Sequence, residues 1–239
     1  MMQVQGREHN LGEGGGGIAR RRSAAAVELT RARLLPPRFY RRDPRMVARE
    51  LLGKVLVRRE PEGLRAGRIV EVEAYLGRAD PAAHSAVGRT ARNFVMFGPP
   101  GRAYVYFSYG NHWCLNVSTL PEGEAGAVLF RALEPLAGLE LMARARRLRA
   151  EQIAGRGARL LTSGPGRLAQ ALGVTRSRDN DKEFTDPSSD LVIVDDGFPP
   201  PEIAVTTRIG ITKAADFPLR YVIAGNEFVS GKKLGRKLR

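Results

Sequence analysis

The chain has 239 residues, of which 43% are hydrophobic and 27% charged. This composition is typical of a globular protein of one or two domains and excludes a disordered or collagen-like chain. No stretch approaches the roughly 18 consecutive apolar residues of a transmembrane helix, so no membrane association is expected. The net charge of +14 predicts a polyanionic partner, with nucleic acid as the first candidate. A basic surface without a partner is the alternative.

The chain contains one cysteine and three histidines. Cys114 alone forms no intramolecular disulfide and no four-cysteine metal cluster, so we expect a reducing compartment. Its apolar neighbours favour a buried side chain over a reactive thiol. His9, His84 and His112 are too scattered for a zinc motif, and neither a metal nor another cofactor is expected.

The two ends of the chain differ from its middle. Residues 1–34 include four consecutive glycines and three consecutive arginines, which predict a flexible basic N-terminal arm. Residues 231–239 have five positive charges and no negative one, which predicts a basic C-terminal tail. We expect one folded domain between them, over residues 35–230.

Helix and strand signals are mixed along this domain. Asp43-Pro44 is a typical helix start, with a capping side chain followed by proline. Further helices are expected over 136–149 and from Ser163-Gly164-Pro165, and a long functional loop over 76–101. Strands are expected at 54–59, 64–75, 102–109, 112–119, 127–133, 191–195, 203–212 and 219–224. Most connections are too short for crossovers, so the fold class is α+β: a single mixed domain with a mainly antiparallel curved sheet and flanking helices.

Two carboxylates alternate along the strand predicted at 64–75. Glu71, Glu73 and Tyr75 share one face of this strand, because successive side chains point to opposite faces. Two carboxylates held close together raise the pKa of at least one, which suits a general base. A solvent-exposed face with surface glutamates is the alternative.

Aromatic residues gather around the turn Gly110-Asn111, which predicts a protruding β-hairpin. Tyr104 and Tyr106 share one face of its first strand and could equally belong to the core. Tyr109 stands immediately before the turn, where it covers its own hairpin or serves as a wedge between the bases of a nucleic acid.

Arginines surround the long loop and the base of the hairpin. We expect Arg89, Arg92 and Arg102 to contact phosphates on either side of a probing hairpin, with Arg78 nearby. A solvated charged loop is the alternative for each of them.

Several motifs occur together and in a set order. They are Gly67-Arg68-Ile69-Val70-Glu71-Val72-Glu73-Ala74-Tyr75, Ala83-His84-Ser85, Arg92-Asn93, Met96-Phe97, Pro100-Gly101, Tyr104-Val105-Tyr106, Tyr109-Gly110, Asn116-Val117-Ser118, Leu129-Phe130-Arg131-Ala132-Leu133-Glu134-Pro135, Ser163-Gly164-Pro165 and Leu219-Arg220-Tyr221-Val222. Over residues 35–225 the chain closely resembles the alkyladenine (3-methyladenine) DNA glycosylases. The resemblance implies a mixed α/β single domain that needs no metal. Residues 1–34, 149–161 and the end after 225 match weakly or not at all.

The resemblance implies a general base and a water site. Glu73 matches the family's base, and Arg131 matches the arginine that helps to hold the attacking water. Leu129 is expected to contribute to the water site through its backbone. Taken alone, Arg131 could simply neutralise Glu71.

The resemblance also implies a pocket for an extruded base. Tyr75, His84 and Tyr106 match the side chains that sandwich the base, and Asn116 matches a residue that screens bases at the pocket floor. Tyr109 matches the wedge that replaces the extruded nucleotide. Taken alone, His84 would more often be a structural histidine and Asn116 a hydrogen-bonding residue at the end of a strand.

The leading hypothesis is a monofunctional DNA N-glycosylase for alkylated or deaminated purines, of the 3-methyladenine, 7-methylguanine and hypoxanthine class. No lysine lies near the motifs, so a Schiff-base lyase step is not expected. Two alternatives are a non-catalytic DNA- or RNA-binding module and a metal-dependent nuclease that uses Glu71 and Glu73. The expected partner is damaged double-stranded DNA and the expected state a monomer, cytoplasmic (nucleoid) if bacterial and nuclear if eukaryotic.

Overall fold

The computed structural model describes Leu29, residues 32–108 and residues 110–231. Most of the expected N-terminal arm, Tyr109 at the expected hairpin tip and nearly all of the C-terminal tail lie outside these residues. The helices are α2 (Pro37–Tyr40), α3 (Pro44–Leu51), α4 (Leu139–Ala145), α5 (Arg159–Thr162), α6 (Pro165–Ala171) and α7 (Arg176–Asp179). The strands are β1 (Arg33–Leu34), β2 (Val55–Glu60), β3 (Gly63–Tyr75), β4 (Ala103–Ser108), β5 (His112–Thr119), β6 (Gly126–Ala137), β7 (Leu191–Asp195), β8 (Ile203–Thr206) and β9 (Arg220–Ile223).

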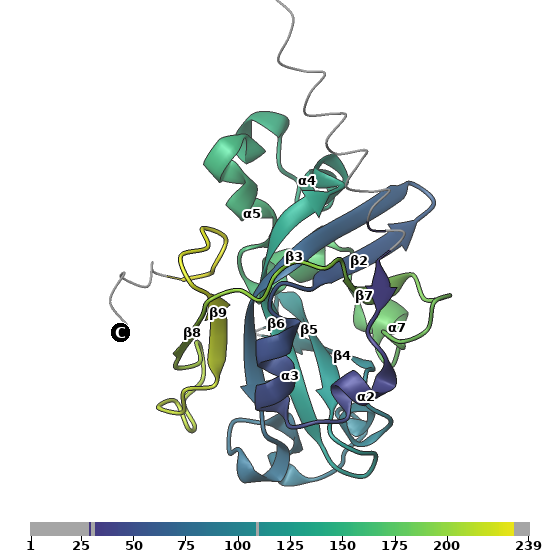
Figure 1. The fold of residues 1–239 in the computed structure, drawn as a ribbon, viewed down its shortest axis with the longest axis vertical. Coiled ribbons are helices and arrows are strands. Elements are labelled where there is room, and N and C mark those ends of the chain that lie inside the picture. Colours follow the sequence, from purple (N-terminus) through teal and green to yellow (C-terminus); the bar gives the residue numbers. More distant parts are fainter. Residues whose placement is uncertain (1–28, 30–31, 109, 232–239) are drawn as a thin grey trace, which may run out of the picture.

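The described strands form one sheet in which all pairs are antiparallel, as the sequence predicts (Figure 1). Its main order is β1-β7-β2-β3-β6-β5-β4, and β9 also pairs with β3 and with β8. The first half of β3 pairs with β2, whereas Glu71–Glu73 pair with β9. The sheet therefore forks along β3, and the fork lies at the two glutamates. The α+β fold class is confirmed.

Helix α3 contributes its apolar face to the main core of the protein. Asp43 accepts a hydrogen bond from the backbone N–H of Arg45 at 2.8 Å, and Pro44 occupies the first turn, so the predicted helix start is confirmed. Apolar residues of α3, such as Val47 and Leu51, are fully buried in the main core with the apolar face of β3 and β6. Burying such side chains stabilises the fold by about 1.5–3 kcal/mol each.

Three predicted segments differ from the structure. The segment 136–149 was expected to be helical throughout, but β6 continues to Ala137 and α4 begins only after Gly138, which has a left-handed φ of 72°. A strand was expected over 203–212, but β8 ends at Thr206. The loop 76–101 contains three short 3-10 helices, η1 (Gly77–Ala79), η2 (His84–Val87) and η3 (Phe94–Phe97). In addition, β1 lies inside the range expected for the arm and pairs with β7.

Strands β4 and β5 pair from Ala103↔Val117 to Ser108↔His112. The segment that connects them includes Tyr109, which the structure does not describe, so its protrusion and its probing of DNA stay predictions.

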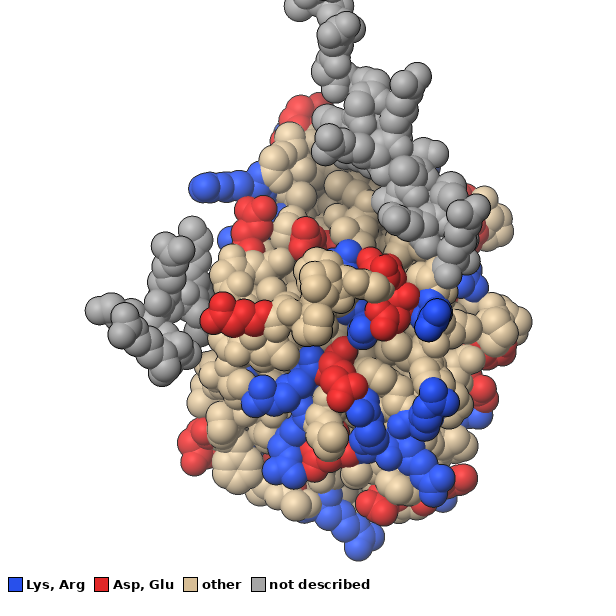
Figure 2. Space-filling model, in the orientation of Figure 1, with Lys and Arg blue, Asp and Glu red and all other residues tan. Residues whose placement is uncertain are grey.

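Positive charge is concentrated on part of the surface. Figure 2 shows Lys and Arg side chains gathered in the lower half of the face where Figure 1 places α2 and α3, with acidic side chains between them. Five arginines lie within residues 37–51, the span of these two helices. Among the described residues, no helix is both long and apolar enough to cross a bilayer.

Candidate active site

One row of residues crosses four neighbouring strands. Glu73 of β3 is opposite Leu129 of β6, Leu129 is opposite Asn116 of β5, and Asn116 is opposite Tyr104 of β4. Directly opposed residues of antiparallel strands place their side chains on the same face. The sheet therefore gathers three of the predicted site residues, together with Tyr104, on one surface.

Arg131 lies on this surface by strand alternation, because it is two residues from Leu129 on β6. The pairing is irregular beside it, since Glu71 is opposite Ala132 whereas Val72 is opposite Phe130. Val70 of β3 and Arg131 of β6 are both left out of the pairing at this point. The guanidinium lies between the two glutamates, with Nε 2.9 Å from Oε1 of Glu71 and Nη1 3.2 Å from Oε1 of Glu73.

Glu73 is fully buried within a polar environment. Its Oε1 accepts a hydrogen bond from the backbone N–H of Ile209 at 2.8 Å and faces Arg131, and its Oε2 accepts one from the Tyr75 hydroxyl at 3.0 Å. A carboxylate has about four acceptor positions, so one remains for a water. Burial raises the pKa of Glu73, although Arg131 and the two hydrogen bonds oppose this. The group thus resembles a general base more than a surface carboxylate.

Glu71 has different surroundings. It accepts hydrogen bonds from Arg131 (2.9 Å), from Arg220 (2.7 Å) and from both the backbone N–H and the hydroxyl of Ser230 (2.6 and 2.9 Å). Three of these bonds go to Oε1 and one to Oε2. The two predicted carboxylates therefore differ, because Glu71 is bound by two guanidinium groups and Glu73 by one.

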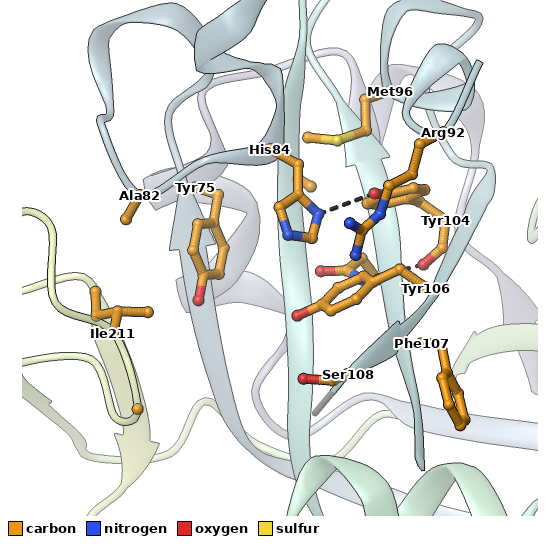
Figure 3. Close-up of a pocket in the computed structure, with 13 residues that line it drawn as sticks. Tyr75, Ala82, His84, Arg92, Met96, Tyr104, Tyr106, Phe107, Ser108 and Ile211 are labelled. Atoms are coloured by element: carbon orange, nitrogen blue, oxygen red, sulfur yellow. Dashed lines mark hydrogen bonds between the residues drawn. The ribbon is translucent and has the colours of Figure 1, made fainter. Parts of the chain in front are cut away.

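A pocket of about 220 Å³ lies on the same side of the sheet. Tyr75 lies across it from His84 and Tyr106, and Met96 borders it (Figure 3). The volume is below the range of about 300–1,000 Å³ typical of pockets for larger ligands, so it suits a single heterocycle. Tyr75 and Gly210 both line the pocket, while the Tyr75 hydroxyl and the neighbouring Ile209 N–H contact Glu73. Glu73 therefore lies directly behind the pocket wall.

His84 is held as a neutral ring. Its Nδ1 lies 2.9 Å from the Tyr104 hydroxyl, and its ring meets Tyr106 edge-on with the ring centres 4.5 Å apart (Figure 3). Burial lowers the pKa of His84, and the positive charge of Arg92 lowers it further. A neutral His84 that accepts from Tyr104 at Nδ1 carries its proton on Nε2.

The sequence prediction missed two residues that contact this site, Arg208 and Ile209. Arg208 forms a buried ion pair with Asp80, donates to the carbonyl of Ala74 at 3.1 Å and covers the Tyr75 ring at 4.7 Å from its centre. Ile209 supplies the N–H that binds Glu73. Both follow the end of β8, where one long strand was expected. Gly210, a glycine inside the expected strand, was the available signal that the strand is interrupted.

Three further residues in or near the pocket have different surroundings. Asn116 lines the pocket and donates from Nδ2 to the Tyr104 carbonyl at 3.0 Å. Leu129 is buried opposite Glu73 and is not part of the pocket lining. Phe107 points away from the other rings (Figure 3) and lies against Trp113, with ring centres 4.7 Å apart.

The three arginines expected at DNA phosphates have different environments. Arg89 is exposed. Arg92 lines the pocket, with its guanidinium 5.8 Å from the centre of the Tyr106 ring. Arg102 forms ion pairs with Asp181, at 3.0 Å, and with Glu183, so a phosphate would have to displace two carboxylates.

The donor set beside the pocket does not resemble a metal site. Within the described ranges, no three His, Cys, Asp or Glu side chains are grouped as metal ligands. Glu71 and Glu73 instead face the guanidinium of Arg131. A nuclease that holds a cation between these carboxylates would need to remove that arginine.

Comparison with known proteins identifies the family. Residues 38–227 match the family described as methylpurine-DNA glycosylase. The chain belongs to the methylpurine-DNA glycosylase family. It is therefore a DNA glycosylase, a hydrolase that acts on the N-glycosidic bond, and its substrate is DNA.

Several relatives of this glycosylase share most of its length. A protein of Koribacter versatilis is 65% identical over 83% of this chain and 94% of its own length. Relatives from Methanoculleus marisnigri and Burkholderia cenocepacia are 52% and 47% identical, over 82% and 83% of this chain and 98% and 91% of their own lengths. All three carry the provisional name 3-methyladenine DNA glycosylase.

Proposed function

We propose that this glycosylase extrudes alkylated or deaminated purines, of the 3-methyladenine, 7-methylguanine and hypoxanthine class, from duplex DNA and releases them with Glu73 as the general base. The observation that carries the proposal is the contact of Glu73 with Arg131 directly behind an aromatic pocket. The names of the relatives support 3-methyladenine as one of the released bases.

Extruding the base from the duplex costs free energy, and stacking of the base in the pocket offsets this cost. A glycosidic bond within duplex DNA is out of reach, and unstacking its nucleotide costs a few kcal/mol, less for a damaged base. Stacking of the extruded base on an aromatic ring contributes about 1–3 kcal/mol. Tyr75, His84 and Tyr106 supply the rings in the pocket, and Tyr109 fills the gap in the DNA. Electron-rich rings also favour an alkylated base that carries positive charge.

The hydrolytic step uses the polar groups behind the pocket. A water at the remaining acceptor position of Glu73 attacks the sugar carbon, and Glu73 accepts its proton. The negative charge of Glu73 also stabilises the oxocarbenium-like sugar as the bond to the base breaks. Arg131 orients the water and keeps Glu73 ionised, since a neighbouring cation favours the charged carboxylate.

The same arrangement supports a monofunctional reaction. No lysine is found among the described residues that line the pocket. A lyase step needs an amine that forms a Schiff base with the sugar. The product is therefore an intact DNA strand with an abasic site. We also propose that the enzyme acts as a monomer.

A base-release assay tests this function. Methylated duplex DNA and duplexes with a single hypoxanthine are incubated with the protein in EDTA, and released bases and strand breaks are both quantified. We expect release of free purine without strand cleavage. Binding without release would support a non-catalytic module, and cleavage that EDTA abolishes would support a metal-dependent nuclease.

A further inference from the structure

Four charged side chains form a compact buried group behind the pocket. Glu71 and Glu73 have no exposed surface, and Arg131 and Arg220 are 7% and 3% exposed. They come from three strands, with both glutamates on β3, Arg131 on β6 and Arg220 on β9. Two negative and two positive charges balance within this group.

Glu71 is the centre of the group. Its Oε1 lies 2.9 Å from Nε of Arg131 and 2.7 Å from Nε of Arg220. Ser230 adds two further donors, its backbone N–H and its hydroxyl, and also accepts from Nη2 of Arg220 at 3.0 Å. Ser230, near the end of the described residues, thus completes the hydrogen bonds around Glu71, which lies where the sheet forks along β3.

This network fixes the orientation of the Arg131 guanidinium. Because Nε of Arg131 is bound to Glu71, the planar guanidinium has little rotational freedom, and Nη1 is left 3.2 Å from Glu73. We infer that Arg220 and Ser230 are positioning residues, which fix Glu71 as an internal counter-ion and so keep Arg131 directed at Glu73. The inference rests on the proposed function of Glu73 as the base.

The other groups around Glu73 do not take over this role. On β3 the Tyr75 hydroxyl donates to Glu73, and Ile209 contributes only a backbone N–H. Arg208 is paired with Asp80. On β5, burial raises the pKa of the Cys114 thiol, which is therefore uncharged at neutral pH. Among the described residues in contact with the two glutamates, Arg131 and Arg220 supply the balancing charge.

The experiment measures single-turnover base release against pH. In Arg220→Gln, Glu71 loses one of its two cations, so its negative charge acts more strongly on Glu73 and raises the pKa of Glu73. The acid limb of the rate profile should therefore move to higher pH. A shift of one unit lowers the rate about tenfold on that limb, while the rate at alkaline pH changes little. Arg220→Lys restores the charge and should recover most of the profile. Ser230→Ala keeps the backbone N–H and should shift the limb less, in the same direction.

Arg68→Gln is the matched control. Arg68 also lies on β3 and forms an ion pair with Asp196 at 2.9 Å, but it has no contact with either glutamate. Its acid limb should coincide with that of the unaltered protein. DNA affinity should be unchanged in all these variants, because Arg220 is almost inaccessible to phosphates.

The outcomes separate the inference from the proposed function. An unchanged acid limb in folded Arg220→Gln, or an equal loss in Arg220→Lys, overturns the inference. If Arg220→Gln does not fold, an unshifted Ser230→Ala profile overturns it instead. If Glu73→Gln retains full base release, the proposed function itself fails, whatever the Arg220 variants do.

Discussion

Arg131 lies beside Glu73, with Nη1 3.2 Å from Oε1, at a point where the pairing of β6 with β3 is irregular. The sheet forks at the same place, because Glu71–Glu73 also pair with β9. A buried carboxylate that keeps a cation, a hydroxyl and an N–H in fixed positions is pre-organised for proton transfer.

A buried charge of this kind lowers stability. Because burial raises the pKa of Glu73, the charged carboxylate opposes folding at pH 7, and this cost disappears as the pH falls through the raised pKa toward the unfolded-state value. We expect Glu73→Gln to melt about 2–4 °C higher at pH 7, the shift that about 1 kcal/mol produces in a protein of this size. Calorimetry between pH 7 and pH 4.5 should show the gain shrinking as the pH falls. A gain that is constant across this range would contradict the prediction.

Asn116 is predicted to restrict which bases enter. Its amide lines the pocket and is fixed by a hydrogen bond to the Tyr104 carbonyl. Asn116→Ser removes this group, and the rate ratio of damaged to undamaged purine release should fall about tenfold, as expected for a small change in a binding pocket. Competition between alkylated and normal duplexes checks this ratio. An unchanged ratio would show that selection occurs elsewhere.

The sequence was informative along the strand 64–75 and at the start of α3. The alternation along 64–75 placed Glu73 and Tyr75 on one face, and Asp43-Pro44 marked the start of α3. Arg131 was named from the family resemblance, but the irregular pairing beside it could not be predicted, because it depends on how two distant strands pair. The contact of Ile209 with Glu73 joins residues 136 positions apart and depends on where β8 ends. The same holds for the carboxylate partners of Arg102, which come from a separate segment.

The arginines should differ in their effect on DNA affinity. Each phosphate contact contributes about 0.9 to the slope of log affinity against log salt. Arg89→Gln and Arg92→Gln should each lower the slope by about that amount. Arg102→Gln should leave it nearly unchanged, because the guanidinium is paired with Asp181 and Glu183. Fluorescence anisotropy from 50 to 300 mM salt, on the order of the physiological range, measures the three slopes, and a full loss in Arg102→Gln would reverse this ranking.

Tyr109 is predicted to act only when a base has to leave a duplex. Tyr109→Ser removes a ring whose stacking contributes about 1–3 kcal/mol, so base release from duplex DNA should fall about tenfold or more. Release from single strands, which need no wedge, should change much less. The ratio of the two rates is the measurement. Equal losses on both substrates would argue against a wedge.

The role of Glu73 as the general base is tested most directly by single-turnover release of 3-methyladenine from methylated duplex DNA. The unaltered protein and Glu73→Gln are compared, with DNA affinity measured in parallel. A positioned general base contributes about 10²–10⁴-fold to the rate. We expect a loss of that size in Glu73→Gln, with DNA affinity retained. Comparable release by the two proteins would contradict the role assigned to Glu73.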